Sequence, residues 1–275
     1  MGRIIDAHVH SSDRRRDDRL RSYAKLNGLR YDLAELLGLM EENGVEKGLL
    51  LSPPMGGGEP LPNPEILRLC GRSRDALFPV FTVEPERGAV REALKLAKEN
   101  KALVKGFKVW LGYRRVHAND GVYAPLYDYA EEHKLPVLFH TGDTASSTGS
   151  LAHAHPLTLD AVANEREGMR IVLCHLGNPW LVDAAELLYK HPNVFADISG
   201  LVVGGGGYHK EYTMMMAQRI SEVIYYVGGA EKLVFGTDYP VETHAEGLSL
   251  VSQLKVTQAD KERILWRNAA RLYSM

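Results

Sequence analysis

Short runs of apolar residues recur along the chain at fairly regular intervals. Most are nearly continuous in hydrophobic residues, as expected for strands of a parallel sheet that is buried on both faces. They begin at positions 3 (RIIDAHVH), 47 (KGLLLS), 77 (LFPVFTV), 104 (VKGFKVW), 136 (PVLFHTG), 170 (RIVLCHLG), 194 (VFADISG) and 233 (LVFGTDYP). The pattern therefore predicts eight parallel strands.

Between these runs the hydrophobic period changes to that of amphipathic helices. Helices are predicted over residues 33–43, 64–73, 88–100, 125–134, 159–166, 179–191, 210–227 and 261–273. Three helix starts carry capping signals: Asp32 with Glu35, Asn63 before a proline, and Thr257 with Asp260. The last helix is expected to close the fold from outside.

The alternation of strands with helices predicts an α/β fold, a (β/α)₈ TIM barrel. The alternative is a doubly wound open sheet, which usually has a glycine-rich turn after its first strand. No G-x-G-x-x-G or P-loop pattern follows any of the apolar runs. A length of 275 residues suits one barrel, and no shift in composition marks a linker. We therefore predict a single domain over residues 1–275.

Composition narrows the functional classes. Hydrophobic residues make up 45% and charged residues 25% of the chain, which is typical of a folded globular protein. The net charge of −2 provides no field that would hold nucleic acid or an anionic membrane. No apolar segment suits secretion or a membrane span, and Cys70 and Cys174 suggest neither a disulfide framework nor a thiolate zinc site. We expect a cytoplasmic protein that binds a small molecule, and a homo-oligomer is compatible with the sequence.

Ionisable residues gather at the carboxyl ends of the predicted strands, where the loops of a parallel barrel converge over one opening. They are His8 and His10 on the first strand, Lys108 on the fourth, His140 on the fifth, His175 on the sixth and Asp238 on the eighth. Residues two apart on a strand share a face, so His8 and His10 should lie side by side. So many ionisable groups are costly to bury together without a cation, which predicts a metal site.

Four of these residues supply three nitrogens and one carboxylate: His8, His10, His140 and Asp238. This set suits Zn²⁺ best, and Mn²⁺, Fe²⁺, Co²⁺ or Ni²⁺ as alternatives. Such an ion lowers the pKa of water or polarises a carbonyl group. His175 is predicted to stand beside it as a proton donor or acceptor, or to orient the water or the substrate.

Several motifs resemble one known family. DAHVH, FHTG, LCHLG and FGTDYP, together with the closing ILWRNAARLY, are similar to motifs of the amidohydrolase superfamily. The most similar branch is the amidohydrolase-related one, which includes aminocarboxymuconate-semialdehyde decarboxylase, and the resemblance covers essentially the whole chain. It implies a distorted barrel, a metal held by the residues matching His8, His10, His140 and Asp238, and an active-site histidine matching His175. In that family the residue matching Asp238 often also takes a proton from the attacking water.

The resemblance also bears on Lys108. Binuclear members of the superfamily carry a carboxylated lysine on the fourth strand, which bridges two metals, whereas the decarboxylase-like branch generally uses one ion. We favour one ion, with Lys108 as an amine paired with an acid inside the barrel. Metal-dependent deoxyribonucleases share the early H-x-H but usually carry a glutamate at this position, so a nuclease is disfavoured.

These observations predict a metal-dependent hydrolase that acts on a small lactone, amide or similar carbonyl compound, with Asp238 and His175 moving protons. A decarboxylase (carboxy-lyase) or a hydratase of an unsaturated or aromatic carboxylate would use the same site. A metal-binding barrel without turnover is the alternative from another class.

Other residues carry weaker expectations. The run RRRDDRLR at 14–21 is expected to be a solvated face, with an arginine over the opening as the alternative, and the glycines at 204–207 are either a lid or a loop. Cys174 is expected to face the helices, and Asp6 to lie inside the barrel and orient a ligand. The methionines at 214–216 are expected in a helix core.

Overall fold

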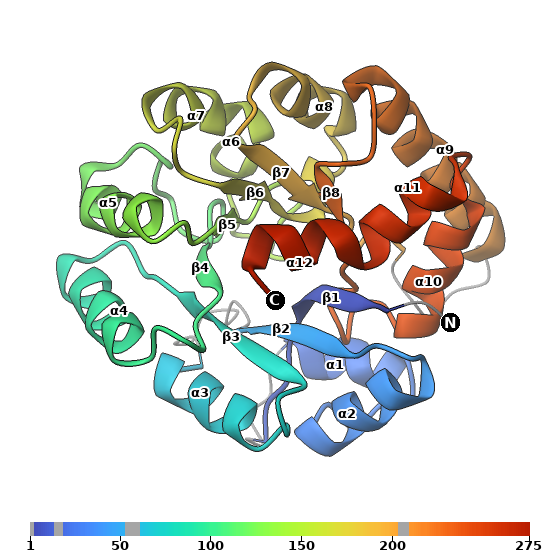
Figure 1. The fold of residues 1–275 in the computed structure, drawn as a ribbon, viewed down its shortest axis with the longest axis horizontal. Coiled ribbons are helices and arrows are strands. Elements are labelled where there is room, and N and C mark those ends of the chain that lie inside the picture. Colours follow the sequence, from blue (N-terminus) through green and yellow to red (C-terminus); the bar gives the residue numbers. More distant parts are fainter. Residues whose placement is uncertain (1–2, 14–18, 53–60, 203–208) are drawn as a thin grey trace.

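The computed structural model of the chain describes residues 3–13, 19–52, 61–202 and 209–275. Its sheet contains eight parallel strands in sequence order, so the predicted (β/α)₈ architecture is confirmed (Figure 1). The strands are β1 (Ile5–Val9), β2 (Lys47–Leu51), β3 (Leu77–Thr82), β4 (Gly106–Val109), β5 (Val137–Phe139), β6 (Ile171–Leu173), β7 (Val194–Asp197) and β8 (Leu233–Val234). The arginines at 14–16 and the glycines at 204–207 lie outside the described residues.

The barrel is nearly closed between its last and first strands. The backbone N–H of Ala7 donates to the carbonyl of Phe235 at 2.8 Å, and the N–H of Asp238 donates to the carbonyl of His8 at 2.8 Å. Val9 and Tyr239 form a parallel bridge just beyond the strand end. These contacts bring the segment after β8 against β1, which places the predicted site residues of both segments side by side.

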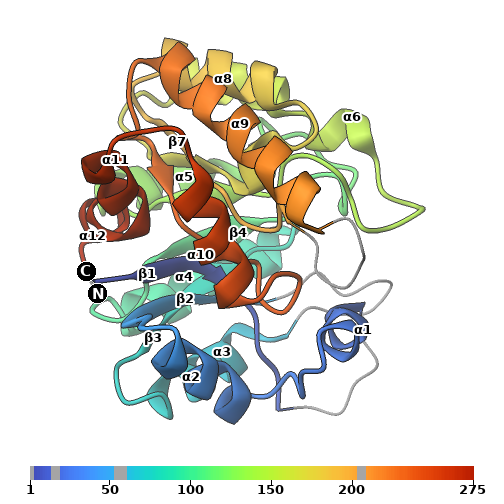
Figure 2. The ribbon, with the colours of Figure 1, turned by 90° about the vertical axis from the view of Figure 1, so that its right-hand side faces the viewer.

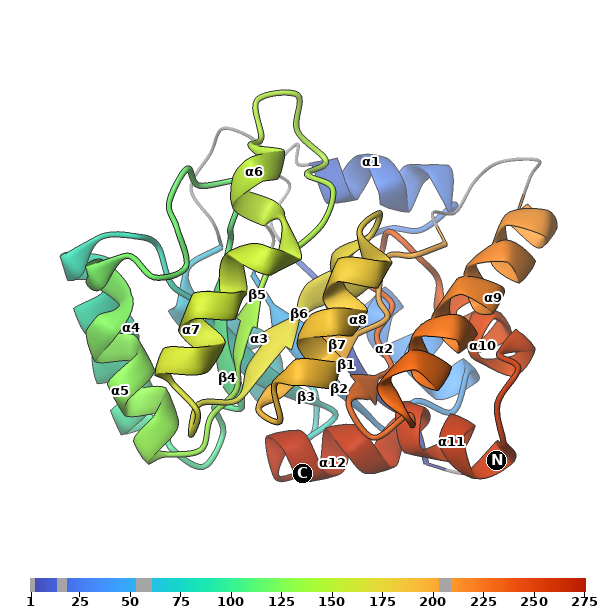
Figure 3. The ribbon, with the colours of Figure 1, turned by 90° about the horizontal axis from the view of Figure 1, so that it is seen from above.

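Helices surround the sheet (Figures 1 and 3). They are α1 (Arg19–Leu26), α2 (Leu33–Glu42), α3 (Asn63–Gly71), α4 (Arg87–Glu99), α5 (Ala124–Glu132), α6 (Leu151–Ala154), α7 (Asp160–Glu165), α8 (Leu181–Lys190), α9 (His209–Val227), α10 (His244–Gln253), α11 (Gln258–Glu262) and α12 (Asn268–Tyr273). Buried strand residues such as Leu50, Phe107 and Phe139 pack against apolar helix faces in one large core. That burial supplies the main stabilisation, at roughly 25 cal/mol per Å² of apolar surface.

A second, smaller core fills the barrel itself. Its strand residues include Ile5 and Ala7, and its other members include Leu272 and Tyr273 of α12. Figure 1 shows α12 crossing one end of the barrel, with the C-terminus near its centre. The terminal helix therefore closes the end of the barrel opposite to the carboxyl ends of the strands.

Two of the three predicted caps are confirmed. The side chain of Asp32 accepts from the backbone N–H of Glu35 at 2.8 Å, and the side chain of Thr257 accepts from the N–H of Asp260 at 3.1 Å. The N-cap predicted at Asn63 is wrong, because its side-chain amide bonds both the N–H and the carbonyl of Thr82 instead. Asn63 thus ties α3 to β3.

In the part of the chain that the structure describes, every helix is too short or too polar to cross a lipid bilayer.

Candidate metal centre

A pocket opens at the carboxyl ends of the strands. It measures about 170 Å³, and its walls include Trp110, Tyr113, His140 and His175. An engineered apolar cavity of about 150 Å³ holds benzene, so this pocket has room for roughly one six-membered ring. His10 and Asp238 also line it, so the pocket brings together three of the four predicted ligands and the predicted proton carrier.

An irregularity in β1 directs the two histidines into this site. Asp6 pairs with Gly48 and Val9 with Leu50, so three steps along β1 match two along β2, as in a β-bulge. The strict alternation expected for β1 is therefore broken at His8.

Asp6 consequently lies away from the pocket, and its predicted place inside the barrel is wrong. Its carboxylate accepts from the hydroxyl of Thr237 at 2.7 Å and lies 3.4 Å from His244 of α10. It also accepts from the backbone N–H groups of His8 at 3.0 Å and Thr237 at 3.1 Å. Asp6 fastens the backbone of β1 to the segment after β8 instead of orienting the ring of a ligand.

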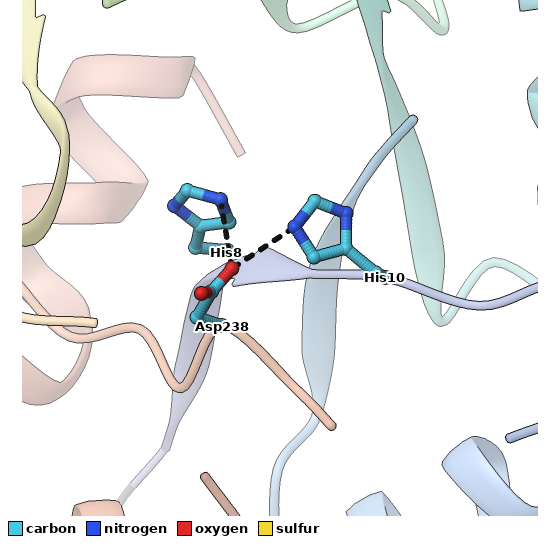
Figure 4. A group of neighbouring side chains, drawn as sticks. All are labelled: His8, His10 and Asp238. Carbon is cyan, nitrogen blue, oxygen red and sulfur yellow. Dashed lines mark hydrogen bonds and ion pairs between the residues drawn. The ribbon is translucent and has the colours of Figure 1, made fainter. Parts of the chain in front are cut away.

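Three of the four predicted ligands come together. The Oδ1 atom of Asp238 lies 2.9 Å from Nε2 of His10 and 3.4 Å from Nε2 of His8 (Figure 4). Candidate ligand atoms of these three residues all lie within 4.8 Å of one another. They come from the two segments that close the barrel.

Hydrogen bonds on the far sides of the rings decide which nitrogens carry protons. Nδ1 of His10 lies 2.8 Å from the carbonyl oxygen of Leu51, which can only accept, so Nδ1 is the donor. Nδ1 of His8 donates to Oδ2 of Asp197 at 3.0 Å in the same way. In the neutral rings, both Nε2 atoms therefore present lone pairs towards the carboxylate of Asp238.

This arrangement fits a cation. The Nε2 atom of His8 is buried and has no hydrogen-bond partner among the described residues. Two imidazole lone pairs and a carboxylate oxygen that converge on one point repel one another unless a positive charge lies between them. Burial and the ammonium group of Lys108 lower the pKa of His8 to about 4, so its ring stays neutral at pH 7, the form that binds metals.

Asp238 has the opposite protonation preference. Burial works against its charge, but the imidazole of His10, 2.9 Å away, and the nearby His175 and His8 hold the pKa of this carboxyl well below its usual range. Its side chain keeps 16% of its surface exposed, so the carboxylate reaches the pocket. Asp238 is therefore an ionised group in contact with the space that a substrate would fill.

His140 lies in the same pocket but apart from the other three. Its Nε2 donates to the backbone carbonyl of Asp143 at 2.9 Å, which leaves Nδ1 buried without a hydrogen-bond partner in the part of the chain that the structure describes. Its ring centre is 5.0 Å from that of His175 and 5.6 Å from that of Trp110. The unpaired Nδ1 suits a ligand, yet His140 does not belong to the set of ligand atoms within 4.8 Å, so its ligand role stays a prediction.

Asp197, at the end of β7, is a site residue that the sequence reasoning missed. It is fully buried, and its Oδ1 accepts from the backbone N–H of His175 at 2.8 Å and from the hydroxyl of Ser199 at 2.6 Å. Burial opposes its charge, but His8, His175 and Lys108 keep the pKa of Asp197 far below its usual range. A carboxylate behind an imidazole fixes the ring and its tautomer, as in many metal sites. Its position at the carboxyl end of a predicted strand is the feature of the sequence that could have identified Asp197 as a site residue.

His175 enters the pocket through an unusual backbone conformation. Its φ of 60° lies in the left-handed region, and the hydrogen bond from its N–H to Asp197 holds it there. Its Nδ1 lies 3.1 Å from the carbonyl oxygen and 3.0 Å from the hydroxyl of Ser199. Because the carbonyl can only accept, Nδ1 carries the proton and Nε2 is left with a lone pair.

The contacts of Lys108 and the position of Cys174 differ from what the sequence predicted. The Nζ atom of Lys108 donates to the Sγ atom of Cys174 at 2.7 Å and lies 4.4 Å from the ring centre of Trp110. The expected acid partner is thus replaced by a thiol and an aromatic face. Cys174 belongs to the core inside the barrel with Val172, because residues two apart share a face, and so it does not face the helices.

Comparisons with known proteins extend the resemblance seen in the motifs. A family model described as Amidohydrolase matches residues 5–275. No curated protein sequence matches the chain. An uncharacterised TIM-barrel protein from Bordetella bronchiseptica superposes with a TM-score of 0.78 at 18% identity, over 99% of this chain and 98% of the other.

Two further solved structures are similar over nearly the full length. A dihydroxybenzoic acid decarboxylase from Polaromonas sp., with bound manganese and the inhibitor 2-nitroresorcinol, gives a TM-score of 0.72 at 15% identity and covers 100% of this chain and 97% of its own. A protein from Pseudomonas putida described as a candidate 2-pyrone-4,6-dicarboxylic acid hydrolase gives 0.71 at 21% identity, with coverage of 98% and 97%. At these identities the likeness shows the fold.

The family model spans all eight strands and contains the histidines in and just after β1, those that follow β5 and β6, and the aspartate after β8. The chain therefore belongs to the amidohydrolase family, and it is an enzyme of the amidohydrolase superfamily.

Proposed function

We propose that this enzyme hydrolyses a small cyclic ester or amide about one ring in size, at a divalent metal ion held by His8, His10 and Asp238. One observation carries the proposal: the unprotonated Nε2 atoms of His8 and His10 converge on the ionised carboxylate of Asp238 at a ring-sized pocket. His140 is the fourth proposed ligand, because its buried Nδ1 has no hydrogen-bond partner within the described segments.

The ion is proposed to be Zn²⁺ or Mn²⁺. Imidazole nitrogens with a carboxylate suit both ions, and the manganese in the Polaromonas relative supports the second. The contact of Lys108 with Cys174 favours one ion over two, since the amine is engaged with the thiol and the face of Trp110.

When bound, the ion would act as a Lewis acid towards a carbonyl oxygen and favour ionisation of water. The protein residues supply positioning and proton transfer. The Nε2 lone pair of His175 accepts a hydrogen bond from the attacking water and orients it. The carboxylate of Asp238 takes a proton from that water and returns it to the leaving oxygen or nitrogen. Its low pKa leaves Asp238 ionised before the reaction, so the carboxylate is free to take up this proton first.

The pocket walls support a planar substrate. The rings of Trp110 and His140 are tilted by 31° with centres 5.6 Å apart, and Tyr113 meets Trp110 edge-on. Aromatic walls bind flat rings through their faces and exclude water from the reacting bond. The substrate proposed is therefore a lactone, a cyclic amide or a similar ring.

Decarboxylation of an aromatic carboxylate is the second candidate. The same ring-sized aromatic pocket would hold it, and the Polaromonas relative is named a decarboxylase. Protonation of a ring carbon would then need an acid, and the ionised Asp238 is less suited to that role than to that of a base.

Mass spectrometry separates the two candidates. The protein, loaded with Zn²⁺ or Mn²⁺, is incubated with 2-pyrones, aromatic lactones, cyclic amides and dihydroxybenzoates in ¹⁸O-labelled water. Hydrolysis yields a product with one labelled oxygen and no CO₂. Release of CO₂ from a carboxylate, with no hydrolysis of any ring, would overturn the proposal in favour of the second candidate.

A variant tests the proton-transfer machinery in the same assay. His175→Asn should lose turnover at least a hundredfold while it keeps its metal content, because His175 touches the pocket but not the three converging ligand atoms. Unchanged turnover in this variant would contradict the role given to His175. A protein that binds its metal but turns over none of the substrate classes would favour a binding barrel.

A further inference from the structure

The outer face of α9 exposes large side chains in a regular stripe. Tyr212, Met215, Arg219, Glu222 and Tyr226 are all exposed and follow one another at steps of three and four residues. Residues at these steps lie on one face of a helix. The expectation that the methionines at 214–216 lie in a core holds for Met216 alone, since Met215 is 42% exposed.

The neighbouring helix α8 extends this surface. Figures 2 and 3 show α8 and α9 side by side on the outside of the barrel. Val182 of α8 is 80% exposed, and the ring of Tyr189 lies 5.7 Å from that of Tyr226. A hollow between the two helices is lined by Val182, Ala185, Arg219, Glu222 and Tyr226, among others. We call these exposed residues of both helices the α8–α9 face.

The composition of the α8–α9 face is that of a protein–protein contact. Tyrosine, methionine and arginine are enriched in interfaces, and a grouped apolar surface is uncommon on a monomer. The hollow provides a recess for an inserted side chain, which is how the residues that dominate binding are usually seated. The pocket of the metal centre has a different lining, so catalysis does not account for this face.

The two charges at the centre of the stripe have no ion-pair partner among the described residues. Within the described ranges the guanidinium of Arg219 makes no hydrogen bond or ion pair, and Glu222 accepts only from Gln218 of its own helix, at 2.8 Å. Arg219 and Glu222 do not pair with each other, although both border the same hollow. The positive charge of Arg219 and the negative charge of Glu222 can therefore both pair with opposite charges on a partner protein, if these follow one another in the reverse order along its surface.

We propose that the α8–α9 face binds the same face of a second copy of this chain, about a two-fold axis that passes between Arg219 and Glu222 of α9. When the two α9 helices run antiparallel about such an axis, Arg219 of each copy lies opposite Glu222 of the other. Met215 lies four residues before Arg219, and Tyr226 lies four residues after Glu222, so Met215 of each copy meets Tyr226 of the other. Charge meets opposite charge and apolar meets apolar, which is the self-complementarity that a two-fold contact requires.

The test uses charge reversal in the full-length protein, with light scattering after size exclusion and sedimentation velocity as readouts. The unaltered protein should have twice the 30.6 kDa mass of one chain. Arg219→Glu and Glu222→Arg should each weaken dimerisation at least tenfold, because each reversal places like charges opposite one another twice. Circular dichroism checks that both variants fold, and Lys95→Glu on the exposed surface of α4 is the matched control, expected to remain dimeric.

Mixing the two variants gives the decisive result. A copy with Arg219→Glu paired with a copy with Glu222→Arg has opposite charges at both contacts, so two weakly associating proteins should together form a stable heterodimer. The double variant with both reversals should also dimerise. A wild-type monomer at 100 µM, a dimer that resists both single reversals, or a mixture that stays monomeric would each overturn the proposal.

Discussion

The contact between Asp197 and His8 can be used to test whether the carboxylate sets the tautomer of His8 that binds the metal. Asp197→Asn keeps the shape of the side chain and removes its charge. In the native protein Oδ1 of Asp197 accepts from His175 and Ser199, while Oδ2 accepts from Nδ1 of His8. The amide oxygen of asparagine should take the place of Oδ1, where several donors converge, so its NH₂ group would face His8.

An NH₂ group opposite Nδ1 reverses the tautomer of His8. Nδ1 must then accept, which moves the proton of the ring to Nε2, the atom that faces Asp238. A protonated Nε2 cannot bind a cation. Partners of this kind change metal affinity by about 10–100-fold, which corresponds to about 1.4–2.7 kcal/mol. The rearranged buried hydrogen bonds should also lower the free energy of unfolding of the metal-free protein by about 1–3 kcal/mol.

Competition with a chromophoric chelator measures the metal affinity, and urea unfolding of the metal-free protein measures stability. Asp160→Asn is the matched control: it makes the same chemical change at a carboxylate that pairs with Lys190 and His191 and is not among the residues that line the pocket. The control should bind metal as the unaltered protein does. If Asp197→Asn also binds metal with unchanged affinity, the tautomer argument for His8 is refuted.

Three further predictions concern burial. Because the pKa of His8 falls from its usual 6.5 to about 4 in the folded chain, chiefly through burial, only the unfolded chain takes up this proton between those values. The metal-free protein should then lose about 3 kcal/mol of unfolding free energy as the pH falls from 6.5 to 4, as measured by urea unfolding. His8→Gln should remove most of that loss. An equal loss in the unaltered protein and in the variant would contradict the role given to His8. Burial raises the pKa of Cys70 to about 12 and that of Cys174 well above its usual value, so an aromatic disulfide reagent at pH 8 should modify neither thiol in the native protein and both after unfolding. Rapid labelling of the native protein would contradict this. Phe139→Ala, in the core between β5 and the helices, should cost about 3–5 kcal/mol of unfolding free energy, and a cost below 1 kcal/mol would show that the side chain packs loosely.

Much of the architecture was accessible from sequence because it depends on local patterns. Each strand coincides with an apolar run, and α2 and α11 begin at the caps predicted from Asp32 and Thr257. The residues at the strand ends also converge, because strand order in a parallel barrel places these ends around one opening. Three of the predicted ligands, His8, His10 and Asp238, accordingly come together, and two of them line the pocket.

The remaining features depend on irregular backbone and distant contacts. The register shift in β1 removes Asp6 from the pocket, and no residue pattern in a five-residue strand announces such a shift. The left-handed turn at His175 likewise depends on its hydrogen bond with Asp197. Asp197 itself lies 189 residues from His8, so only the folded chain shows that the two are partners.

The proposed function depends on one divalent cation that binds between the first strand and the segment after the eighth. Anomalous diffraction from crystals of the protein loaded with Zn²⁺, collected at the zinc absorption edge, tests it most directly. We expect one strong peak about 2.0–2.2 Å from Nε2 of His8, Nε2 of His10 and the carboxylate of Asp238. A peak that lies elsewhere, or no peak at this position in crystals that contain zinc, would contradict it.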